Sequence, residues 1–133
     1  MPISALEKLQ EWISCYPGWD ACLQNVCILP QKMEEISRQK DVLGNTLVGY
    51  RCYVTLNWEM PTLTEETQNT HRLLRFIQWV QHQSAVGYAP CFGDVPARER
   101  IRTEKGGLIP GNQTVTYTVT LVVDYMKNYE VKK

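Results

Sequence analysis

The amino-acid sequence predicts an α+β fold, in which an antiparallel β-sheet carries two helices packed on one face. Apolar and polar residues alternate from residue 48 to 60 and again from residue 114 to 125. This two-residue period is typical of a strand with one buried face. Between these segments, apolar residues recur at the three- and four-residue spacing of a helix. With 44% apolar and 21% charged residues, the chain has the composition of a folded globular protein.

A short amphipathic helix is expected near the N-terminus. Ser4 and Glu7 have the spacing of a capping box, in which each side chain accepts a hydrogen bond from the backbone N–H of the other residue. Pro17 and Gly18 are expected to end the helix. Its apolar side is formed by residues at helical spacing: Leu6, Leu9, Ile13 and Tyr16.

The region before the first clear strand is less regular. Residues 23–29 form a weakly apolar run, which we interpret as an edge strand that Pro30 closes. Residues 31–40 are mostly polar and predict a helical turn or a loop. A Gly-Asn pair then favours a turn. We therefore expect residues 42–46 to form a hairpin or bulge that leads into the strand at residues 48–60.

A second helix is expected after that strand. Thr62 and Glu65 form another capping box, and the helical spacing continues to about Val86. The side that packs on the sheet is predicted to contain Leu73, Phe76, Ile77 and Val80. The opposite, polar side contains His71, Arg75, Gln78 and His82, with Trp79 at its edge.

The segment "GYAPCFGDVPARERIRTEK" at residues 87–105 combines turn residues with alternating arginines and glutamates. It is interpreted as a charged loop that, with the glycines and proline at residues 106–112, connects the second helix to the last strand. Residues 114–125 form that strand, with an apolar face and a row of threonines on the other face. A single domain is therefore expected over residues 1–125, followed by a charged, flexible tail at residues 126–133.

The charge and the cysteines limit the classes of function. Fourteen basic and fourteen acidic residues give a net charge of zero, so nucleic acid and an anionic membrane are not expected as partners. No apolar stretch approaches the about 20 residues that span a bilayer. The five cysteines are an odd number without zinc-site spacing, and no signal peptide is recognised. This pattern predicts reduced, buried thiols and a cytoplasmic setting.

No catalytic arrangement stands out. His71 and His82 are eleven residues apart on one predicted helix, which places them about 16 Å apart and prevents them from sharing a metal ion. A pair of Cys91 and His82 lacks an acid that would orient the imidazole. Phosphate-binding glycine loops are also missing from the sequence. We therefore expect a non-enzymatic protein with no catalytic, cofactor or metal site.

Several segments together resemble a known group of proteins. The stretch "RFIQWVQHQSAVGYAPCFGDVPARERIRTEKGGL" and the strand "TVTYTVTLVVDY" resemble small structural proteins from prophage tail-morphogenesis clusters of Gram-positive bacteria. The segments "LEKLQEWISCYPGW" and "EEISRQKDVLGNTLVGYRCYVTL" are similar to the same group, so the likeness covers Leu6 to about Tyr125. Size and element order are similar to those of phage tail-terminator (tail-completion) proteins.

This resemblance implies a homo-oligomeric ring subunit, commonly hexameric, that caps the tail tube and contacts the head-tail connector. It also implies a location in the cytoplasm of the bacterial host during assembly and in the virion tail afterwards. Another role in the neck, or as a minor structural protein of the virion, is the alternative. A small regulator that binds nucleic acid through its arginines is a further one.

The alternating charges suggest where such subunits would touch. Charge complementarity fixes the register of a contact between protein surfaces. We therefore predict that the assembly interface contains Arg98, Glu99, Arg100 and Arg102, with Trp79 as an aromatic anchor. The alternative for Trp79 is packing against the chain's own sheet.

Overall fold

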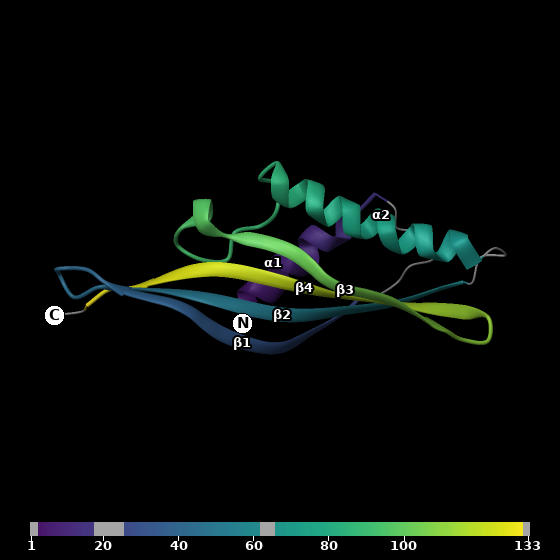
Figure 1. Cartoon of the computed structure of the whole chain (residues 1–133), viewed down its shortest axis with the longest axis horizontal. Coiled ribbons are helices and arrows are strands. Elements are labelled where there is room, and N and C mark those ends of the chain that lie inside the picture. The colour runs from purple at the N-terminus through teal and green to yellow at the C-terminus, as the bar shows by residue number, and fades with distance from the viewer. Residues whose placement is uncertain (1–2, 18–25, 62–65, 132–133) are drawn as a thin grey trace.

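The computed structural model describes residues 3–17, 26–61 and 66–131. Over these residues the chain forms two α-helices, one short 3₁₀ helix and a four-stranded antiparallel sheet with the strand order β1-β2-β4-β3. This arrangement confirms the predicted α+β class. The strands run along the length of the molecule, and α2 lies lengthwise beside β3 (Figure 1). The elements are α1 (Ile3–Ser14), β1 (Cys27–Lys40), β2 (Thr46–Pro61), α2 (Glu66–Ala85), η1 (Pro96–Arg98), β3 (Arg100–Pro110) and β4 (Thr114–Tyr129).

The two central strands, β2 and β4, are the segments in which alternation was clearest. Each has 16 residues, and they pair over their whole length, from Thr46 opposite Tyr129 to Pro61 opposite Thr114. The predicted start of a flexible tail at residue 126 is wrong, because β4 continues to Tyr129 and Met126 is buried. Pairing with β2 holds residues 126–129 in the sheet.

The prediction of a loop or helical turn at residues 31–40 is also wrong. These residues belong to β1, which continues through Pro30 instead of ending there. The pairing with β2 shifts by one residue between Pro30 and Lys32 and again between Glu35 and Ser37. These bulges break the two-residue period, which is why the sequence did not show a strand. The sequence predicted an edge strand at residues 23–29, and β1 lies at the edge of the sheet, which confirms this position for residues 27–29. Residues 23–25 lie outside the described residues.

The turn between β1 and β2 confirms the predicted hairpin. The carboxylate of Asp41 accepts hydrogen bonds from the backbone N–H groups of Leu43 and Asn45, at 2.9 and 3.0 Å. Gly44 has a φ of 90°, a backbone conformation that glycine adopts without strain. The turn is therefore held by its own side chains.

The segment after α2 also differs from the prediction. Residues 100–110, which were predicted to be loop and turn, form the edge strand β3 and pair with β4. A register shift at Glu104 and the charged, exposed side chains hide this strand in the sequence. The packing of α2 explains the glycine at position 106. A Cβ atom there would lie 3.1 Å from the Cδ1 atom of Ile77, so glycine leaves room for α2 beside β3.

The hydrophobic core lies between the sheet and the two helices. Leu9 and Ile13 of α1 and Phe76 and Val80 of α2 pack on one face of the sheet, and all four are 2% exposed or less. This confirms that both helices cover the same face. The sheet contributes alternate residues of β2 and β4: Cys52, Val54, Leu56, Trp58, Met60, Val115, Tyr117, Val119, Leu121, Val123 and Tyr125.

The helix boundaries agree with the sequence to within a few residues. The structure places Ser4 inside α1, which begins at Ile3, so Ser4 does not precede the first turn. The second capping box, at residues 62–65, lies outside the described residues. Neither of the two helices is both long enough and apolar enough over its described residues to cross a membrane.

Candidate functional site

The residues considered for catalysis are dispersed. His71 and His82 are both exposed on α2, and Cys91 is exposed in the loop after it. Within the described part of the chain, no three His, Cys, Asp or Glu side chains come close enough together to hold a metal ion.

The prediction that the thiols are buried holds for Cys52 alone among the described cysteines. Burial raises the pKa of the Cys52 thiol above its ordinary value. Cys15, Cys27 and Cys91 are exposed, because they lie in the turn after α1, at the start of an edge strand and in a loop, respectively.

Trp79 packs between the two helices. Its ring stacks on Trp12 of α1, with 5.0 Å between ring centroids and 25° between ring planes, and lies 5.3 Å from the ring of Tyr16. The indole N–H of Trp12 donates a hydrogen bond to Gln83 at 3.2 Å, which ties the helices together. Trp79 therefore contacts α1. The sequence had indicated either a subunit interface or the chain's own sheet as the surface that Trp79 packs against. Its role as an interface anchor stays a prediction.

The predicted run of alternating charges is divided between two elements. Arg98 is exposed in η1, whereas Arg100 and Arg102 are exposed on β3. Glu99 instead points into the loop, where its Oε1 atom accepts hydrogen bonds from the backbone N–H groups of Phe92 and Gly93, at 2.5 and 3.1 Å. Glu99 thus holds the loop that presents Arg98.

The same loop is attached to the end of β4. The backbone N–H of Asp94 donates to the carbonyl oxygen of Met126 at 2.7 Å, and the Asp94 carboxylate accepts from the backbone N–H of Asn128 at 2.7 Å. A Cβ atom on Gly93 would overlap the Met126 carbonyl group, so only glycine allows this approach. The loop therefore continues the edge of β4 beyond the start of β3. The sequence predicted turn chemistry here and did not reveal the attachment.

The face of the sheet opposite the helices is covered by neither of the described helices, and we call it the open face. The side chains that alternate with the core residues lie on it. They are small and mostly uncharged toward one end, as the threonine row predicted. The central strands contribute Arg51, Tyr53, Thr55, Asn57, Glu59, Thr114, Thr116, Thr118, Thr120, Val122 and Asp124.

Four charged residues cross the open face in one line, which we call the charged row. The strand register places Glu34 of β1 opposite Arg51 of β2, Arg51 opposite Asp124 of β4, and Asp124 opposite Arg100 of β3. The signs along the row are therefore negative, positive, negative, positive. These residues come from four separate segments, so no local pattern in the sequence indicates the row.

The centre of the charged row is a two-point ion pair. The guanidinium of Arg51 donates to both carboxylate oxygens of Asp124, at 2.8 and 3.0 Å. This hydrogen bonding, together with the negative charge of Asp124, raises the pKa of Arg51 above its ordinary value. At one end of the row, Glu34 forms an ion pair with Lys32 at 2.9 Å.

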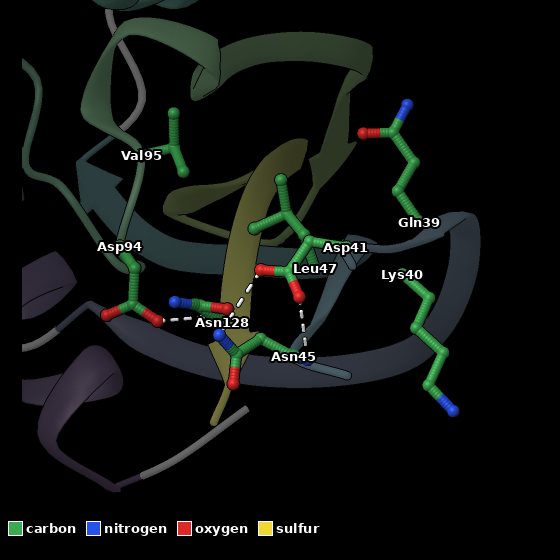
Figure 2. Close-up of a pocket in the computed structure, with 8 residues that line it drawn as sticks. All are labelled: Gln39, Lys40, Asp41, Asn45, Leu47, Asp94, Val95 and Asn128. Atoms are coloured by element: carbon green, nitrogen blue, oxygen red, sulfur yellow. Dashed lines mark hydrogen bonds between the residues drawn. The ribbon is translucent and has the colours of Figure 1, made fainter. Parts of the chain in front are cut away.

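A pocket of about 670 Å³ lies between the β1–β2 hairpin and the loop at residues 94–95 (Figure 2). Its two carboxylates are already engaged, because Asp41 binds the hairpin turn and Asp94 binds β4. Neither carboxylate is therefore free for a ligand, and both serve to fix the walls. The pocket is lined by Gln39, Lys40, Asp41, Asn45, Leu47, Asp94, Val95 and Asn128.

No model of a known protein family matches the chain, and no curated protein matches it in sequence.

Proposed function

We propose that this protein is a non-enzymatic phage tail assembly protein, a tail-terminator-like ring subunit that caps the tail tube and joins it to the head-tail connector. In this proposal the subunit assembles in the cytoplasm of the bacterial host and remains in the virion tail. The observation that carries the proposal is a group of three exposed arginines, Arg98, Arg100 and Arg102, which we call the arginine edge. Hydrogen bonds and strand pairing hold the backbone of this group in place. A ring needs a subunit surface that keeps its shape when it meets a neighbour.

The arginine edge is supported at two points. Glu99 and Asp94 fix the loop that presents Arg98 through hydrogen bonds to backbone N–H groups. Strand pairing with β4 holds Arg100 and Arg102. Exposed cations on a fixed backbone suit a contact whose register is set by charge, since little backbone freedom is lost on binding.

The tip of the β1–β2 hairpin offers a second contact surface. Val42 is 102% exposed and Leu43 is 78% exposed, although both are aliphatic. Their turn is ordered by Asp41 and Asn45, and Asn45 also accepts a hydrogen bond from the backbone N–H of Val131 at 3.0 Å. Apolar residues held in this way at an extended tip favour contact with another protein. We propose the tail tube as that protein.

The test is binding to purified tail tubes that lack their terminal ring. Electron microscopy should show the protein at one end of the tube, and the bound mass should correspond to several copies. Arg98→Glu should reduce this binding while leaving the fold intact, because Arg98 is exposed and lies outside the core. Arg75→Glu, on the exposed side of α2, is the matched control and should bind like the wild type.

Other outcomes would redirect the proposal. Binding to the connector but not to the tube end would favour another neck or minor structural role. Absence of binding to both would refute the proposal.

The three exposed arginines also favour a second candidate, a nucleic-acid-binding regulator. In that case duplex DNA should bind with an affinity that falls steeply as salt increases.

A further inference from the structure

We propose that the open face is a contact between two copies of this chain, packed face to face about a two-fold axis parallel to the strands. The charged row and the row of threonines carry this inference. It goes beyond the proposed function and does not depend on it, because two copies can pair whether or not the protein assembles on tails.

The charge pattern selects this orientation. A rotation about an axis parallel to the strands reverses the order of the row in the second copy. Glu34 then faces Arg100 of the second copy, and Arg51 faces Asp124 of the second copy. Every charge of the row meets its opposite. Rotation about an axis along the row would instead place each residue on its own counterpart, with like charges in contact, which is unfavourable.

The central ion pair makes burial of this row tolerable. Arg51 and Asp124 already neutralise each other within one chain, and their side chains are 32% and 17% exposed. Covering them therefore leaves no unpaired charge. The new interactions are the two symmetric pairs of Glu34 with Arg100, whose side chains are accessible in the single chain.

The neighbouring parts of the open face permit close approach. The row beside the charged row has Tyr53 and the buried Val122 at its centre. Its two ends are Arg102 and Lys32, and the Nζ atom of Lys32 lies 4.7 Å from the centroid of the Tyr53 ring. These two cations would face each other, and Glu34, which lies 2.9 Å from Lys32 in the same chain, would be shared between Lys32 and Arg100 of the second copy. Further along, threonines predominate, and such small side chains allow two sheets to approach the roughly 10 Å spacing of packed sheets.

The area is sufficient for a specific dimer. Strands of 16 residues are about 53 Å long at about 3.3 Å per residue, and four strands span about 14 Å. The open face therefore offers roughly 700 Å² per copy. Specific interfaces bury about 800 Å² per partner, so the open face matches what a stable pair of proteins needs.

The test reverses the charges of Glu34 and Arg100, singly and together, and measures the mass of the full chain by sedimentation equilibrium. The wild type should be a dimer in the micromolar range. Glu34→Arg and Arg100→Glu should each weaken the dimer by about tenfold or more, because each places like charges opposite each other. The double variant E34R/R100E should regain most of the affinity, because the two altered residues again face opposite charges in the second copy.

Control variants separate the interface from the fold. Glu7→Arg and Arg75→Glu reverse exposed charges on the helices and should leave the dimer unchanged. Thermal unfolding of each variant shows whether the fold is intact. Thr118→Arg, at a half-buried position of the open face, provides a second test if a charge reversal fails to fold. It should dissociate the dimer, because it places a long cation among the small threonine side chains of the open face.

The inference would be overturned by a wild type that stays monomeric, by a dimer that neither single reversal affects, or by a double variant that does not recover. A ring of larger mass that is insensitive to all these changes would also overturn it, while remaining compatible with the proposed function.

Discussion

Gly93→Ala is expected to detach the loop at residues 92–95 from β4. The added Cβ would overlap the carbonyl group of Met126, which is backbone and is held in the sheet by pairing with Gly49. The loop must then move away, and two hydrogen bonds of Asp94 are lost with it. These are its own N–H to Met126 and its carboxylate to the N–H of Asn128, both at 2.7 Å.

The size of the effect follows from these two bonds. A neutral backbone hydrogen bond contributes about 1 kcal/mol net, and one to a charged group contributes about 1.5 kcal/mol at the low end. The low end applies because the Asp94 side chain is 41% exposed. Alanine also lowers the conformational entropy of the unfolded chain, which stabilises the folded state and offsets about 0.5 kcal/mol of this loss. The free energy of unfolding should therefore fall by about 2 kcal/mol, or roughly 8 °C in Tm for a chain of this size.

Urea unfolding gives the change in free energy, and hydrogen exchange at the amide of Asn128 reports the loop itself. That amide should lose its protection in Gly93→Ala. Gly107→Ala is the matched control, because its Cβ would lie 3.5 Å from the nearest heavy atom, an ordinary contact. It should change stability by less than about 0.5 kcal/mol. A Gly93→Ala protein that is as stable as the wild type, with Asn128 still protected, would refute this account of the loop.

Two further predictions concern the core. Val119 is fully buried in β4, so Val119→Asp should abolish the cooperative thermal transition seen by circular dichroism, and a retained transition near the wild-type Tm would contradict the core assignment. Burial raises the pKa of the Tyr125 phenol well above its ordinary value of 10.0, so above about pH 10 the folded state keeps a proton that the unfolded state loses. The free energy of unfolding should therefore fall as pH rises from about 9 to 11, and Tyr125→Phe should make this fall less steep in urea titrations; an unchanged slope would argue against a buried phenol.

The prediction from sequence succeeded where burial was one-sided. Residues 48–60 and 114–125 alternate because β2 and β4 lie at the centre of the sheet with one face in the core. The edge strand β3 and residues 30–40 of β1 were missed because their side chains are largely exposed and bulges interrupt their period. Residues 126–129 were missed because their polar composition resembles that of a tail, although β2 pairs with them.

The candidate surfaces show the same division. The sequence identified Arg98, Arg100 and Arg102 as a group, since they are close together along the chain. It could not show that Glu99 turns inward, because that depends on two backbone N–H groups six and seven residues away. Trp79 was expected at an edge, and only the packing of α1 against α2 revealed its contact with Trp12.

By itself, the sequence determined the α+β class, the two central strands and the side of each helix that faces the core, because these features follow from the local period of apolar residues. The tertiary structure alone decided the pairing of four distant segments. That pairing aligns Glu34, Arg51, Asp124 and Arg100 across the open face and attaches the loop of Asp94 to β4. Register is set by hydrogen bonds between strands far apart in the chain, so no local pattern specifies which charges become neighbours.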